Sequence, residues 1–153
     1  MITDLGIEEC KEFLSKNYLG HLGYISGKDP FVTTITLFYD ASENSILSYA
    51  AIGHKIMAMR NNNRVTLHVE NVQSIQEWSS VLIHGIFEEI EGSAAKKYLH
   101  KFAQGVQDTI EKLKGEKPKF ISDFSGRLQK RDMPIIYRIK INGITGKIRT
   151  LKT

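Results

Sequence analysis

Two adjacent basic residues, His54 and Lys55, follow Gly53 where the chain changes from a strand-like to a helix-like pattern. The first turn of a helix has unpaired backbone N–H groups and the positive end of the helix dipole, so it favours a bound anion. His54 and Lys55 add side-chain donors there, and Lys55 adds a full charge. The turn therefore indicates a site for a phosphate-bearing ligand. The simpler alternative is a helix that begins with exposed basic residues, since one Gly-His-Lys tripeptide is a weak signal.

Two further groups of polar residues could contact a ligand. Thr33, Thr34 and Thr36 lie in an expected strand, and their hydroxyls could orient a heterocyclic ligand if that strand lines a cavity. Threonine is also common in strands for steric reasons alone. The segment Trp78-Ser79-Ser80 begins another expected strand. Its tryptophan is typical of a core or interface anchor, whereas its serines could donate to the polar edge of a ring.

Other chemistries find little support. The five histidines are His21, His54, His68, His84 and His100. No two of them have the H-x-x-x-H spacing, and no nearby cysteine completes a zinc site, so no metal site is expected. Haem needs only one axial ligand, so the histidine spacing does not exclude a haem site. The nucleophile-elbow, Walker A and dinucleotide-binding motifs are absent from the sequence.

Composition indicates a globular protein. The chain has 153 residues, a net charge of +4 and a pI near 9.1. Its basic residues are scattered among acidic ones, which argues against nucleic-acid binding. A single cysteine, Cys10, allows no intrachain disulfide and fits a reducing compartment. No apolar run is long enough to span a membrane, and the N-terminus lacks the pattern of a signal peptide. We therefore expect one cytoplasmic domain over residues 1–153.

The positioning elements follow from hydrophobic periodicity. Ile7, Cys10 and Leu14 have helical spacing, and residues 53–61 indicate a short helix with Ile56 and Met59 buried. Further helices are expected at residues 93–102 and 106–114. Strands are expected at residues 19–26, 31–39, 45–49, 64–70, 79–90, 135–141 and 144–149.

The last two expected strands are joined by Asn142-Gly143, a dipeptide typical of a tight hairpin turn. Six or seven strands with short connections and peripheral helices predict a closed or nearly closed antiparallel barrel, mainly β. Residues 115–133 have the composition of a loop and could form a lid.

In this order, the segments resemble the pyridoxamine 5′-phosphate oxidase-like superfamily of FMN-binding split barrels. Residues 32–40 are similar to the strand that runs beside the isoalloxazine ring in that superfamily. Residues 48–55, followed by 61–65, are similar to its phosphate-binding turn, helix and next strand. Residues 78–85 are similar to the strand whose start touches the flavin.

The resemblance implies an FMN cofactor and a role for each candidate residue. It implies that His54 and Lys55 bind the phosphate and that Thr33, Thr34 and Thr36 contact the ring or the ribityl chain. It further implies that Ser48 and Tyr49 line the same pocket, and that Ser80 lies near the polar edge of the ring beside Trp78 and Ser79. Flavin sites of this superfamily lie at a homodimer interface, so a homodimer with two FMN is implied.

Departures from the pattern narrow the function. Val32 and Leu37 stand where the authentic oxidase has basic residues, and its tryptophan- and arginine-rich C-terminal signature is absent. Pyridoxamine phosphate is therefore not the expected substrate. The chain is more similar to short flavin-binding members of the superfamily, including those resembling nitroimidazole-resistance reductases.

We expect an oxidoreductase that passes electrons from a reduced nicotinamide-type donor to a small organic acceptor. The alternative is a flavin- or haem-binding module without turnover, acting as carrier, store or sensor. The catalytic residue stays unassigned, with Tyr49, His54 and Arg138 as candidates for an acid or base.

Overall fold

The computed structural model describes residues 1–114 and 134–151, and within them one eight-stranded antiparallel sheet carries three helices. The elements in chain order are β1 (Ile2–Leu5), α1 (Ile7–Ser15), β2 (Leu19–Ser26), β3 (Asp29–Thr36), β4 (Phe38–Asp40), β5 (Ser45–Ala50), α2 (His54–Asn61), β6 (Arg64–Ser74), β7 (Glu77–Glu89), α3 (Ser93–Lys114) and β8 (Ile135–Arg149).

The sheet curls into a barrel that stays open along one seam. Its strand order is β3-β2-β6-β7-β8-β5-β4, with β1 paired to β8. The two ends of this order, β3 and β4, are separated in the chain only by Leu37, so the sheet must bend back on itself. At the seam, the Ser48 hydroxyl donates to the Thr36 carbonyl at 2.7 Å. The predicted class, a mainly β split barrel, is confirmed, and the described residues form eight strands rather than six or seven.

Alternating side chains fill the barrel interior. Val81, Ile83 and Phe87 of β7 are buried, as their two-residue spacing predicts. The same core contains Ile56 and Met59 of α2, both fully buried. The short helix is therefore held against the barrel by the two residues that the sequence assigned to its buried side.

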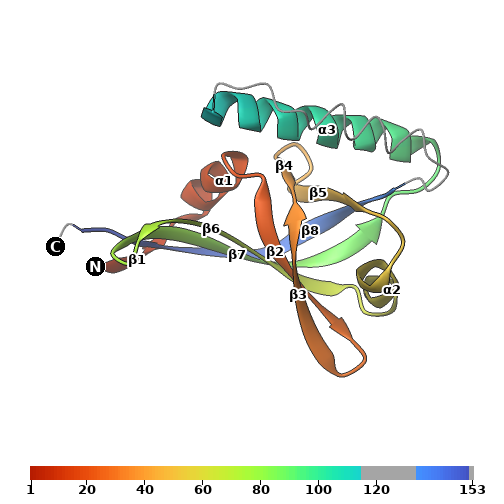
Figure 1. Ribbon diagram of the computed structural model, residues 1–153, viewed down its shortest axis with the longest axis horizontal. Helices are drawn as coiled ribbons and strands as arrows, with labels where there is room; N and C mark the ends of the chain where they lie inside the picture. The colour runs from red at the N-terminus through yellow and green to blue at the C-terminus, as the bar shows by residue number, and fades with distance from the viewer. Residues whose placement is uncertain (115–133, 152–153) are drawn as a thin grey trace.

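Helix α3 covers one side of the barrel (Figure 1). Its buried side chains Leu99, Phe102 and Val106 pack in one cluster with residues of β5 and β8. The sequence predicted two helices here, but the structure has one that continues through Gly105. A Cβ at Gly105 would lie 2.3 Å from the Phe38 ring, so the glycine permits close packing of α3 on β4 instead of ending the helix.

The predicted hairpin at Asn142-Gly143 is wrong, because β8 is a single strand through this dipeptide. Its partner β7 has 13 residues and pairs with β8 on both sides of Asn142. The register shifts between His84, which faces Gly143, and Gly85, which faces Ile141. Asn142 is thus the extra residue of a β-bulge, which bends the strand without reversing it.

The structure confirms some of the other predicted elements and differs from the rest. Helix α1 contains the three residues with helical spacing, and α2 begins one residue after its expected start. The expected strand over residues 31–39 is split at Leu37 into β3 and β4, and β1 was not among the expected strands. The predicted loop at 115–133 lies outside the described residues, and the single domain over 1–153 stays a prediction. Among the described helices, none is long and apolar enough to cross a membrane.

Candidate functional site

A polar pocket opens at the barrel seam, between β3 and the start of α2. Its volume is about 450 Å³, within the range of about 300–1,000 Å³ typical of small-molecule sites. We call it the α2 pocket. The residues that line it are Tyr24, Thr33, Thr34, Ile35, Thr36, Tyr49, Ala50, Ala51, Ile52, Gly53, His54 and Lys55.

The first turn of α2 faces this pocket with its backbone donors uncapped. Gly53 occupies the N-cap position in an extended conformation and forms no side-chain cap. No acidic residue stands in the first turn. Both features differ from the usual preference for a capping oxygen or a carboxylate at a helix start. The turn therefore has unmet capacity for an external anion.

Lys55 adds a partly desolvated cation to this turn. Its side chain is half-buried, and burial lowers the pKa of the ammonium group from its ordinary value. Within the described part of the chain, no carboxylate forms an ion pair with Lys55. Partial burial makes this charge less favourable than an exposed one unless a partner neutralises it, so the site favours an anionic ligand.

An aromatic cluster orients His54. The Tyr24 hydroxyl and His54 Nδ1 lie 2.9 Å apart in a hydrogen bond. The Phe31 ring meets the imidazole edge-on, with ring centroids 4.8 Å apart, and stacks on Tyr24 at 5.6 Å. With Nδ1 engaged in this way, the other ring nitrogen of His54 is available to a ligand.

The threonine strand and Tyr49 complete the wall. Thr33, Thr34, Thr36 and Tyr49 all line the α2 pocket, so the structure gathers them with His54 and Lys55. Ser48 is placed differently. It is 1% exposed, and its hydroxyl donates to the Thr36 carbonyl, so it fixes the wall from behind.

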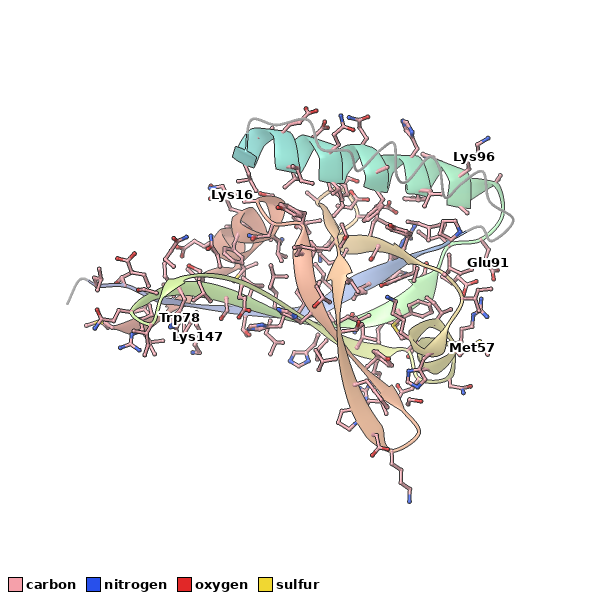
Figure 2. The ribbon with its side chains drawn as sticks, in the orientation of Figure 1. Lys16, Met57, Trp78, Glu91, Lys96 and Lys147 are labelled. Atoms are coloured by element: carbon pink, nitrogen blue, oxygen red, sulfur yellow. The ribbon has the colours of Figure 1, made fainter. Side chains whose placement is uncertain are left out.

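The structure places the three residues of the segment Trp78-Ser79-Ser80 away from the α2 pocket. They belong to the end of β7 that forms, with β1 and β6, an arm away from the barrel (Figure 1). Trp78 lies in this arm, whereas Met57 of α2 lies on the opposite side of the molecule (Figure 2). Trp78 and Ser79 line a separate hollow with Arg149 and Leu151. One chain therefore does not bring these three residues to the α2 pocket.

Several pocket residues were not named as candidate contacts, although some lie within the stretches that resemble the family. Ile35 and the segment 50–52 contribute walls through their position at the seam. Tyr24 was detectable, because the turn at Gly27-Lys28 pairs residues at equal distances on either side of it. That register places Tyr24 opposite Phe31, as the structure has it.

Other candidate chemistry does not gather at this site. Arg138 does not line the α2 pocket, and its guanidinium lies 3.5 Å from the Glu88 carboxylate and 3.7 Å from that of Glu43. Within residues 1–114 and 134–151, no group of three histidine, cysteine or acidic residues has the geometry to hold a metal ion.

Known proteins resemble this chain in sequence and in fold. A sequence profile of the family described as "Pyridoxamine 5'-phosphate oxidase" matches residues 7–148. An uncharacterized protein of Rhizobium meliloti (strain 1021) is 30% identical over 83 residues, which are 54% of this chain and 54% of that protein. The match thus spans about half of this relative.

Three solved structures show the same fold. An FAD-binding protein from Mesorhizobium loti has a TM-score of 0.74 at 20% identity, with 98% of each chain covered. An FAD-binding protein from Mycobacterium smegmatis has a TM-score of 0.60 at 16% identity, covering 96% of this chain and 98% of that one. A heme-binding protein from Mycobacterium smegmatis has a TM-score of 0.68 at 10% identity, covering 90% of this chain and 51% of that one. At these identities the likeness concerns the fold alone.

Proposed function

The chain belongs to the pyridoxamine 5′-phosphate oxidase family, and on that premise we propose that it is an FMN-binding oxidoreductase with the cofactor phosphate in the α2 pocket. One observation carries the proposal: Lys55 is half-buried beside an uncapped helix start and has no carboxylate partner among the described residues. A phosphate dianion supplies the charge that this arrangement lacks.

The remaining pocket residues fit the rest of the cofactor. Thr33, Thr34 and Thr36 offer hydroxyls and backbone groups to the ring or ribityl chain, and Tyr49 offers an aromatic wall. Bound FMN would supply the electron transfer, and the residues of this chain would hold and orient it. The substrate in this proposal is a small organic acceptor, and the donor is a reduced nicotinamide.

A phosphate-specific test is available. We expect Lys55→Ala to raise the Kd for FMN by about 10- to 100-fold, because a charge-assisted contact is lost. Riboflavin, which has the same ring without the phosphate, should bind the variant and the wild-type protein equally. The matched control is Lys96→Ala, which removes a lysine from the first turn of α3, away from the pocket (Figure 2). An unchanged FMN affinity in Lys55→Ala would refute the phosphate assignment.

Turnover is tested separately. Under anaerobic conditions, NADH or NADPH should bleach the flavin absorbance, and a small acceptor should restore it. A flavin spectrum that neither nucleotide bleaches would contradict the oxidoreductase and leave a flavin carrier, store or sensor.

We also propose that the cofactor site is shared between two copies of the chain. Trp78, Ser79 and Ser80 lie in the arm, away from the α2 pocket, so a second copy would have to supply them if they touch the flavin. Sedimentation should then give twice the chain mass. Mixing Lys55→Ala chains with Trp78→Ala chains should restore one tight FMN site per heterodimer. Failure of the mixture to bind better than either variant would contradict the shared site.

Haem binding is the second candidate, because a heme-binding protein shares this fold. The absorption spectrum of the purified protein distinguishes the two. Flavin bands support the first candidate, whereas a Soret band supports the second. The proposal also retains a cytoplasmic location and the absence of nucleic-acid and membrane partners.

A further inference from the structure

A second hollow lies on the outer face of the sheet, behind the wall of the α2 pocket. Its volume is about 620 Å³, and five strands line it: β2, β3, β6, β7 and β8. We call it the outer hollow. Only Tyr24 lines both this hollow and the α2 pocket.

Strand register places residues of five strands side by side on this face. Pairing aligns Val32, Gly23, Thr66, His84 and Gly143 in one row across the five strands. Residues paired across antiparallel strands share a face, so this row lies on the outside of the barrel. Gly23 has no side chain, and a Cβ there would lie 2.5 Å from Thr66 Oγ1. The Thr66 side chain therefore occupies the space above Gly23, and the hollow lies between this threonine and the apolar side chains of β2 and β3.

The walls of the hollow are mainly apolar. Ile25 and Val32 are 38% and 73% exposed, and Pro30 and Ile86 stand beside them. Exposed apolar side chains around a concavity are typical of a site for an apolar ligand.

The polar groups of the hollow are basic or neutral. Arg64 and His84 are exposed, and Thr66 and the bulge residue Asn142 add a hydroxyl and an amide. None of the 13 lining residues is acidic. Among the residues that the structure describes, neither Arg64 nor His84 takes part in an ion pair. The site therefore complements a ligand with one negative group.

We propose that the outer hollow binds a small apolar carboxylate, with the ring or hydrocarbon body against Ile25 and Val32 and the carboxylate at Arg64. A second copy of this chain fits the site less well. A two-fold contact centred on this hollow would bury the Arg64 guanidinium against the same set of lining residues, none of which is acidic, so the charge would have no carboxylate partner. The site is independent of FMN, since it shares only the Tyr24 wall with the α2 pocket.

The test uses naphthalene-2-carboxylate as the probe, titrated calorimetrically into the purified full chain. We expect one saturable site per chain. Naphthalene-2-carboxamide has the same body without the charge and should bind at least about tenfold more weakly, and so should acetate, which has the charge without the body. Saturation with FMN should leave the affinity for naphthalene-2-carboxylate unchanged.

Two variants locate the site. Arg64→Gln should weaken binding of naphthalene-2-carboxylate by about tenfold, and Val32→Glu should abolish it by adding a like charge to the rim. Arg149→Gln, at the far end of β8, is the matched control and should bind as the wild type does. Equal affinities for the acid and the amide, an unaffected Arg64→Gln variant, or loss of the probe on addition of FMN would each overturn the proposal. A change of oligomeric state in Arg64→Gln would also overturn it, because the face would then be a subunit contact.

Discussion

The α2 pocket and the outer hollow lie on opposite sides of the same β2–β3 ribbon, yet their chemistry differs. The α2 pocket combines a helix start, Lys55 and several hydroxyls. The outer hollow combines apolar walls with one guanidinium, that of Arg64. Adjacent residues of β2 serve the two sites, because Tyr24 faces inward and Ile25 outward. Alternation along a single strand is thus enough to give the two sides of one ribbon different chemical surfaces.

The largest expected difference between the two regions concerns their backbones. Gly85 lies in the floor of the outer hollow, and a Cβ there would lie 2.5 Å from the Lys140 carbonyl oxygen. We expect Gly85→Ala to lower the free energy of unfolding by about 3 kcal/mol, measured by urea titration. The matching change at the α2 pocket is Gly53→Ala, where the nearest atom is 3.9 Å away and the loss should stay below about 1 kcal/mol. Equal losses would show that the two backbones are equally tolerant.

Charge reversal should separate the two ligands. Lys55→Glu should weaken FMN binding by at least about 100-fold and leave naphthalene-2-carboxylate binding intact. Arg64→Glu should do the opposite. Parallel titrations of both variants with both ligands check this crossover. If either variant loses both ligands, the two regions act as one site.

A change at Tyr24, which lines both hollows, should affect ligand binding in the α2 pocket only. Tyr24→Phe removes the hydroxyl bonded to His54 Nδ1 and keeps the ring. We expect the Kd for FMN to rise by about three- to tenfold, because His54 loses its orientation. The outer hollow should be unaffected, since the hydroxyl bonds inward. Weaker naphthalene-2-carboxylate binding in this variant would show that the wall transmits the change.

The smallest effect concerns the stability of the ligand-free protein. Burial lowers the pKa of Lys55, so in the folded state this lysine holds its proton less tightly than in the unfolded chain. The resulting destabilisation is present in full below the folded pKa and disappears as the pH rises through the ordinary value of about 10.4. Lys55→Met should therefore raise the free energy of unfolding, measured by urea titration at pH 7, by about 0.5 kcal/mol, with a higher urea midpoint and a gain that shrinks toward about pH 10.4.

Arg64→Met, at the exposed arginine of the outer hollow, should leave the midpoint unchanged at either pH. A lower midpoint for Lys55→Met would mean that Lys55 stabilises the empty pocket, and the anion would then not be needed to explain it.

Local patterns predicted much of this fold. The alternation of Val81, Ile83 and Phe87 gave the inward face of β7, and Ile56 and Met59 gave the buried side of α2. The wrong predictions lie where contacts between distant segments determine the structure. Asn142-Gly143 fits a hairpin turn locally, but the length of β7 keeps β8 extended through it. Gly105 weakens a helix locally, but the Phe38 ring occupies the space that it leaves.

The candidate site likewise contains residues that the sequence predicted and residues whose place depends on the fold. The anion-binding character of His54 and Lys55 was predicted from adjacent residues, and the family resemblance favoured a ligand-binding role for the threonines, which line the same pocket. The place of Ser48 behind the wall depends on the seam with Thr36, which no local pattern encodes. The outer hollow was missed altogether, since its row joins residues from five strands.

The open seam affects how readily backbone amide protons near it exchange with solvent. On its free side, β3 has no strand partner among the described residues, and the Ser48–Thr36 hydrogen bond is a side-chain link across the gap. Amide protons along an unpaired edge exchange with solvent through small local openings, whereas those between β7 and β8 require much larger ones. The β3 wall of the α2 pocket is thus more readily opened than the β7–β8 pair. A ligand bound against β3 would cover this edge and slow the exchange of its amide protons.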